Sequence, residues 1–105
     1  MKKSYNKLVR DRIPEIIEAA GGKCKTAVLG DEEYLKMLDA KLDEELAEYH
    51  KDQNIEELAD LVEVIYAAAI ARGYTAEELE AVRVKKREER GGFKDKILLI
   101  DTVTE

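Results

Sequence analysis

The most regular hydrophobic pattern of the chain lies in the stretch from residue 34 to residue 49. Apolar side chains recur there at steps of one, three and four residues: Tyr34, Leu35, Leu38, Leu42, Leu46 and Tyr49. This spacing predicts an amphipathic helix. Asp31 stands ahead of the pattern as its expected N-cap, and the polar run 51–54 ends it.

A second and more apolar helix is predicted from Ile55 to Arg72. Residues 61–70 are apolar nearly all round, which indicates a central, buried helix. Gly73 ends this helix. A capping box at residues 75–78 then opens a further helix that runs to about Arg90.

The two ends of the chain carry shorter elements. Residues 5–20 predict a strand or loop that leads into a short helix, with Pro14 in the first helical turn. Residues 23–29 and 97–100 have the character of strands, and they could pair as a small two-stranded sheet with helices packed behind it. The expected fold is therefore mainly α-helical, a four-helix bundle with a small β element.

The length of 105 residues corresponds to one domain, spanning residues 1–105. A core of this size is modest. A long amphipathic helix pair and a nearly all-apolar helix need more cover than one chain provides, so we expect a homodimer or a homotetramer.

The net charge of −6 argues against binding of a nucleic-acid polymer, which would be repelled. No apolar run reaches the length of a membrane span, and the basic start has no apolar stretch behind it, so neither a membrane partner nor a secretory signal is expected. The single Cys24 cannot form an internal disulfide, which favours a reducing compartment. Together these features predict a cytoplasmic protein.

Four acids stand at helical spacing within the two long helices. Glu45 and Glu48 are three residues apart, as are Glu57 and Asp60, so each pair shares a helix face. Glu45 falls on the apolar stripe of its helix, where a carboxylate without a partner is costly. In an antiparallel helix pair the four carboxylates would converge, and a hard divalent cation suits such a site, Mg²⁺ first and Mn²⁺ as a substitute.

Ordinary surface roles also fit these acids. Residues 54–57 have the pattern of a capping box, in which Glu57 bonds back to the backbone of Asn54. Glu44 and Glu48 could form surface pairs with neighbouring lysines, at positions 41 and 51. In that interpretation the chain is a non-catalytic helical interaction module.

Three motifs together resemble a known family. Residues 41–48 with 57–60 resemble the EExxE…ExxD pattern of the MazG-like, all-α nucleoside triphosphate pyrophosphohydrolases. Residues 7–17, KLVRDRIPEII, look like the KLVRDKIPEII opening of a compact house-cleaning branch, with Arg12 in place of lysine. With the RGGF segment at 90–93, the resemblance covers nearly the whole chain.

This resemblance implies Mg²⁺-dependent hydrolysis of a nucleoside triphosphate to the monophosphate and pyrophosphate, which clears non-canonical or surplus nucleotides. It places Glu45, Glu48, Glu57 and Asp60 at the metal-ligand positions. Glu44 falls on the first acid of the motif, where it would add a metal contact or orient the attacking water. Catalysis is thus assigned to Glu44 and Glu45. A related family acts on phosphoribosyl-ATP, and that substrate remains an alternative.

Such a reaction also needs cations that bind phosphate. One face of the last helix carries four of them: Arg83, Lys86, Arg87 and Arg90. They either bind the triphosphate or form a solvated stripe near a helix C-terminus, where cations are favoured. Lys7, Arg10 and Arg12 pose the same choice, with Arg10 raised by the resemblance and Asp11 as its local partner otherwise. Lys41, one turn before Glu45, either binds substrate or neutralises the acids.

Overall fold

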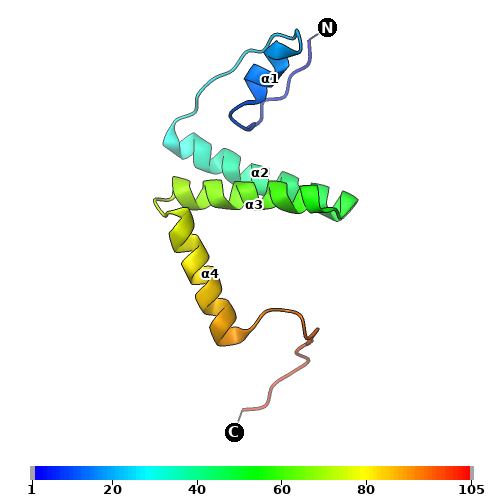
Figure 1. Cartoon of the computed structure of the whole chain (residues 1–105), viewed down its shortest axis with the longest axis vertical. Helices are drawn as coiled ribbons and strands as arrows, with labels where there is room; N and C mark the ends of the chain where they lie inside the picture. Colours follow the sequence, from blue (N-terminus) through cyan, green and yellow to red (C-terminus); the bar gives the residue numbers. More distant parts are fainter. Residues whose placement is uncertain (1, 105) are drawn as a thin grey trace.

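The computed structural model describes residues 2–104 as four helices joined by loops (Figure 1). The helices are α1 (Ile13–Ala19), α2 (Asp31–Asp52), α3 (Ile55–Ala71) and α4 (Ala76–Arg90). The prediction of a mainly α-helical fold is therefore confirmed, and the helix bounds follow the predicted ones closely.

The centre of the molecule is a hairpin in which α2 and α3 pack side by side and run in opposite directions (Figure 1). Leu38 of α2 and Val64 of α3 are its buried apolar side chains, at 2% and 8% exposure. Gln53 turns the chain with a left-handed backbone, φ 51°. The side chain of Asn54 then accepts a hydrogen bond from the Glu57 N–H and caps α3.

The helix starts follow the sequence signals with one exception. Thr75 and Glu78 form the predicted capping box of α4, each side chain bonded to the other residue's backbone N–H. The N-cap of α2, however, is Gly30, so the prediction of Asp31 as the cap is wrong by one residue. Asp31 lies instead in the first turn, where its negative charge interacts favourably with the positive end of the helix dipole.

The predicted two-stranded sheet does not form: the described part of the chain contains no strand. Residues 23–29 lie between α1 and α2, whereas residues 97–100 lie beyond α4, toward the other end of the molecule (Figure 1). An apolar run with strand character needs a neighbour to complete its backbone hydrogen bonds. Within this chain the two runs are too far apart to form backbone hydrogen bonds with each other.

The helices do not close into a compact bundle. The molecule measures 66 × 31 × 22 Å with a radius of gyration of 18.6 Å, against about 13 Å for a compact domain of about 100 residues. Among the described helices, α4 packs only against α3, and α1 stands apart from the others. Within residues 2–104 no helix is long and apolar enough to cross a membrane.

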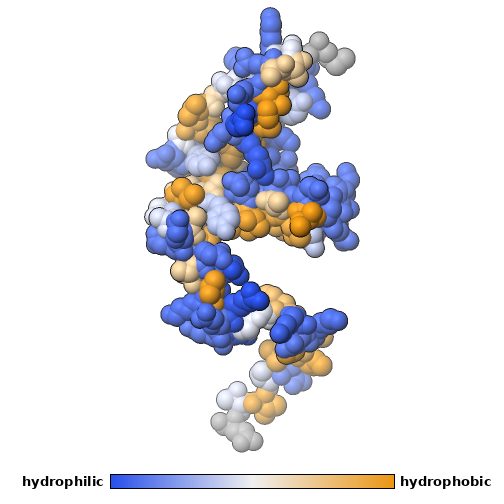
Figure 2. Space-filling model, in the orientation of Figure 1, coloured by the Kyte–Doolittle hydropathy of each residue, from blue (hydrophilic) through white to orange (hydrophobic). Residues whose placement is uncertain are grey.

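The expected burial of α3 is wrong for a single chain. Leu58, Val62 and Ile65 are 44%, 46% and 40% exposed, and they share one face because they are spaced by four and three residues. Figure 2 shows apolar surface left open on the α2–α3 hairpin. The cause is geometric, since α4 leads away from α3 and covers only a small part of it (Figure 1).

Candidate metal centre

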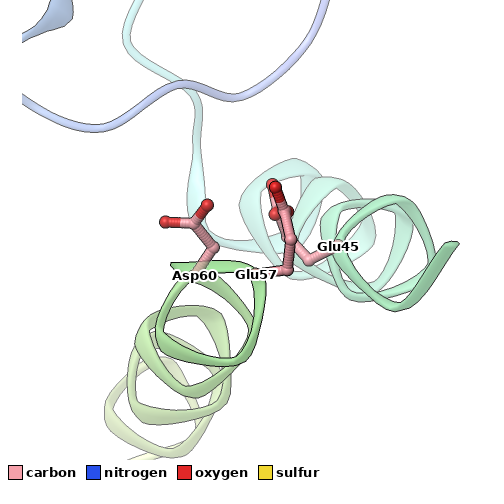
Figure 3. A group of neighbouring side chains, drawn as sticks. All are labelled: Glu45, Glu57 and Asp60. Atoms are coloured by element: carbon pink, nitrogen blue, oxygen red, sulfur yellow. The ribbon is translucent and has the colours of Figure 1, made fainter. Parts of the chain in front are cut away.

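Three carboxylates from the two central helices meet on one side of the hairpin. Glu45 of α2 and Glu57 and Asp60 of α3 each offer one oxygen, and these oxygens lie within 4.8 Å of one another (Figure 3). We call these residues the acid trio. The hairpin brings them together because the last turns of α2 lie beside the first turns of α3, and Glu57 and Asp60 are one turn apart.

A second acid group lies next to the trio and shares one member with it. Oxygens of Glu48, Asp52 and Glu57 also lie within 4.8 Å of one another. Glu48 was predicted from its spacing, and the structure places it in this group instead of beside Asp60. Asp52 was missed because the polar run 51–54 was interpreted as a helix break. The sequence signal for Asp52 is its spacing of four residues from Glu48. This spacing puts both side chains on one face of α2, because α2 continues to Asp52.

The members of the trio differ in their surroundings. The Glu45 side chain is 12% exposed, as its place on the apolar stripe of α2 predicts, whereas Asp60 is 41% exposed. Lys41 lies one turn before Glu45, is itself 17% exposed, and places its Nζ 3.5 Å from oxygens of both Glu44 and Glu45. Lys41 thus neutralises part of the acidic charge, which was one of the two roles that the sequence left open.

The surroundings of Glu57 disfavour its charged form. Partial burial, followed by the negative charges of Asp52, Asp60 and Glu48, raises the pKa of Glu57 above its ordinary value. Its backbone N–H bonds to Asn54, but within the described residues its carboxylate makes no return bond to the Asn54 backbone. The capping residue and the acid group are therefore compatible, because the cap uses the backbone of Glu57 and leaves its carboxylate among the other acids.

The N-terminal segment, residues 7–10, reaches across to the acids through two ion pairs. Lys7 Nζ lies 2.9 Å from Oε1 of Glu44, and Arg10 Nη2 lies 2.6 Å from Oδ1 of Asp60. The hydrogen bond with Lys7 lowers the pKa of Glu44 and raises the pKa of Lys7. A local pair between Arg10 and Asp11 does not form in the described residues.

The third cation of residues 7–12 lies elsewhere. Arg12 pairs with Glu15 on α1, at 3.1 Å, and takes no part in the acid cluster. Of the basic residues near the N-terminus, Lys7 and Arg10 are therefore the two that the structure brings to the acids. The sequence alone does not predict that Lys7 reaches the acids, because nothing in its spacing distinguishes Lys7 from Arg12.

The four cations of α4, which we call the basic stripe, lie away from the trio within one chain. Arg83 pairs with Glu80, and this bond raises the pKa of Arg83. Within residues 2–104 none of Lys86, Arg87 and Arg90 forms an ion pair, and all are exposed. Because α4 joins the C-terminal end of α3 and the trio lies near its N-terminal end, the stripe does not reach the trio (Figure 1).

Glu63 also stands apart from the trio. It lies on α3 but lines a shallow hollow against α4, together with Tyr66, Ala76, Glu77 and Glu80. It therefore offers a carboxylate on the same helix that belongs to neither acid group within the described residues.

Comparison with known proteins gives a partial match. A protein of Mycolicibacterium smegmatis, described only as uncharacterized, is 61% identical over 41 residues, which are 39% of this chain and 42% of the relative. The match thus spans less than half the length of that relative. No protein-family model and no solved structure matches the chain.

Proposed function

We propose that this protein is a Mg²⁺-dependent nucleoside triphosphate pyrophosphohydrolase that removes non-canonical or surplus nucleotides. The observation that carries the proposal is the convergence of Glu45, Glu57 and Asp60 from two antiparallel helices. The same acids carry the resemblance to the MazG-like enzymes, and the KLVRDRIPEII segment that completes the resemblance contributes Lys7 and Arg10 to the same place.

The donor set of the trio suits a hard cation. All three donors are carboxylate oxygens, the ligands that Mg²⁺ prefers, and Mg²⁺ takes only one or two protein carboxylates in many phosphate sites. Ligand oxygens at about 2.0–2.1 Å from the ion lie no more than about 4.2 Å apart. The oxygens of the trio lie within 4.8 Å of one another, which is close to this spacing.

The second acid group extends the site. Because Glu57 belongs to both groups, its carboxylate would lie between two neighbouring ions, one held with Glu45 and Asp60 and the other with Glu48 and Asp52. Partial burial and then like-charge repulsion raise the pKa of Glu57, and a cation held here would relieve the repulsion. This arrangement favours more than one ion when a triphosphate is bound.

When bound, Mg²⁺ would neutralise phosphate charge and acidify a coordinated water. The chain itself supplies the ligands and the carboxylate that orients the water. We assign the second role to Glu44, which neighbours Glu45 in sequence but stands outside both acid groups. Lys7 and Lys41 lower the pKa of Glu44. Glu44 therefore stays ionised and can accept a hydrogen bond from the attacking water.

Phosphate contacts would come from cations beside the acids. Arg10 and Lys41 already lie there, at 2.6 Å from Asp60 and 3.5 Å from Glu45 respectively. A guanidinium can donate hydrogen bonds to two phosphate oxygens at once, so Arg10 suits phosphate binding better than Lys41 does. The basic stripe is also assigned to substrate, but in a single chain it is remote, and a second copy would have to bring it to the trio.

We propose a homodimer or homotetramer for the same reason. The exposed face of α3, formed by Leu58, Val62 and Ile65, needs cover, and the chain alone is far from compact. If two α3 helices pack antiparallel through this face, the C-terminal end of one lies beside the N-terminal end of the other. The basic stripe of one copy then approaches the acid trio of its partner, and their opposite charges favour this arrangement.

The proposal is tested with a panel of nucleoside triphosphates, together with phosphoribosyl-ATP, in the presence of Mg²⁺. Products are separated by ion-exchange chromatography, so that the monophosphate with pyrophosphate is distinguished from the diphosphate with orthophosphate. Pyrophosphate from one or more nucleoside triphosphates supports the proposal. Turnover of phosphoribosyl-ATP alone would move the assignment to that substrate, and no turnover of any compound would leave a non-catalytic helical module.

A further inference from the structure

The N-terminal part of the chain, residues 2–20, is joined to the long helices by very few contacts. Its helix α1 packs against no other helix of the described chain, and Figure 1 shows α1 across the hairpin from α4. Among the described residues, two ion pairs are the polar contacts that link residues 2–20 to the three long helices. One joins Lys7 to Glu44 and the other joins Arg10 to Asp60. Both links therefore end on acids of the candidate metal centre.

These two links are weak by their nature. The side chains of Lys7 and Arg10 are 45% and 56% exposed. An exposed ion pair stabilises a contact by about fivefold at most, and salt screens it. Leu8, which lies between the two cations, is half-buried and adds a small apolar contact. A change in charge at the acids is therefore large enough to detach this part of the chain.

We propose that residues 2–20 form a strap, held on the acids by these two ion pairs, and that a divalent cation bound by the acid trio releases the strap. Asp60 is a member of the trio and also the acceptor of the Arg10 hydrogen bond, with 2.6 Å between Nη2 and Oδ1. A Mg²⁺ ligand oxygen lies about 2.0–2.1 Å from the ion. The ion and the guanidinium would thus meet at one small carboxylate, where their like charges repel each other.

Lys7 is affected by the same change in charge. Its hydrogen bond to Glu44 is the main cause of its raised pKa, and the negative charges of Glu45 and Glu48 contribute to it. A cation beside Glu45 would offset part of this negative charge, so the second link weakens together with the first. The strap then covers the acids when they hold no cation, and it leaves them open to an anionic ligand when they do.

The inference rests on the cation site of the proposed function but not on hydrolysis. It is tested by limited proteolysis with trypsin, in samples whose Mn²⁺ occupancy is measured by electron paramagnetic resonance. Trypsin must take the Lys7 side chain into its own pocket, so cleavage after Lys7 requires the link to Glu44 to open. Lys25 is the internal reference, because it is exposed in the connection between α1 and α2 and forms no ion pair in the described residues.

At constant ionic strength, saturating Mn²⁺ should raise the initial rate of cleavage after Lys7, relative to Lys25, by about threefold or more. In EDTA, about 1 M NaCl should also raise this ratio, because screening then acts over only about 3 Å. Asp60→Asn loses one link and a ligand, so its ratio should be high already in EDTA and should respond little to Mn²⁺. Glu63→Gln is the matched control and should behave as the unaltered chain does, because Glu63 lies outside both acid groups.

The outcomes separate the strap from the function proposed above. Mn²⁺ binding with an unchanged cleavage ratio would overturn the strap and leave the metal centre intact, and so would an equal Mn²⁺ response in Asp60→Asn. Absence of Mn²⁺ binding would overturn both the release of the strap and the cation site. Mn²⁺ binding that releases the strap, in a chain that hydrolyses no nucleoside triphosphate, would contradict only the hydrolase. Circular dichroism checks that the variants keep the same helicity.

Discussion

Arg10 and Asp60 are 50 positions apart in sequence, yet Nη2 of the arginine lies 2.6 Å from Oδ1 of the aspartate. Asp60 belongs to the acid trio, so one of its oxygens is already engaged by a cation of the protein. Both side chains are largely exposed, at 56% and 41%, and exposed pairs of this kind contribute only about 0–1 kcal/mol. Arg10 is therefore held loosely, and under the proposed function it would exchange Asp60 for a phosphate group when an ion occupies the trio.

Arg10→Ala should separate metal binding from turnover. The variant frees Asp60 from its competitor, so Mn²⁺ affinity should stay the same or rise by up to about fivefold, the equivalent of a surface ion pair. Pyrophosphate release should fall, because a phosphate clamp is lost. Arg12→Ala is the control, since Arg12 pairs with Glu15 away from the acids. Equal effects in the two variants would show that Arg10 has no special role.

Glu45→Gln should impair the binding of the ion itself. Residues that merely support metal ligands contribute about 10–100-fold to affinity, so loss of a ligand should lower Mn²⁺ affinity by at least about tenfold. The titration is followed by electron paramagnetic resonance of free Mn²⁺. Glu63→Gln serves as the matched control, because Glu63 is on α3 but outside both acid groups. Unchanged Mn²⁺ affinity in Glu45→Gln would remove Glu45 from the metal site.

Glu57→Gln should stabilise the metal-free protein at neutral pH. Because the pKa of Glu57 is raised above 4.5, its ionised form is disfavoured in the fold. The folded state thus loses stability as the pH rises from 4.5 through this raised pKa, and the variant avoids the loss. Its melting temperature in EDTA at pH 7 should exceed that of Glu56→Gln, a variant in the same first turn of α3 with the same effect on the helix dipole.

The difference between these two variants should shrink as the pH falls below 4.5, because Glu57 of the Glu56→Gln chain becomes protonated in both its folded and its unfolded state. Added Mg²⁺ should reverse their order at neutral pH, because only the Glu56→Gln chain keeps Glu57 as a ligand. Identical melting curves for the two variants across this pH range would contradict the raised pKa of Glu57.

Glu44→Gln should lower turnover while Mn²⁺ binding is kept. Glu44 lies outside both acid groups and is paired with Lys7 and Lys41. Its pKa is lowered below 4.5, so the stability it contributes is present above pH 4.5 and is lost only as the pH falls through the lowered value. A variant with full turnover, or with a loss of Mn²⁺ affinity as large as that of Glu45→Gln, would show that Glu44 does not orient the water.

The helices were predictable because their signals are local. Hydrophobic steps of three and four residues, the glycine at 73 and the capping box at 75–78 each act within a few residues of the structure that they specify. The convergence of Glu45 with Asp60 followed from one further inference, that two helices joined by a short polar turn run antiparallel. The hydrophobic periodicity of α2 likewise predicted the low exposure of the Glu45 side chain, which is 12% exposed in the structure.

Other features depend on contacts that local patterns do not encode. The pairing of Lys7 with Glu44 spans 37 residues, and its geometry depends on the loop path before α1. The burial of α3 was overestimated because apolar content shows that a helix needs cover but not whether the same chain supplies it. The predicted pairing of residues 23–29 with residues 97–100 was wrong for a similar reason, because strand character in a sequence does not specify which segment the strand pairs with.

The central claim is that a divalent cation held by the acid trio carries the hydrolysis of nucleoside triphosphates. The most direct test is the rate of pyrophosphate release as a function of Mg²⁺ concentration for the unaltered chain, Asp60→Asn and Glu63→Gln. We predict no release in EDTA, a saturable rise with Mg²⁺ in the unaltered chain and in Glu63→Gln, and a loss of most of this rise in Asp60→Asn. Release that is independent of Mg²⁺, or equal in Asp60→Asn and Glu63→Gln, would contradict the claim.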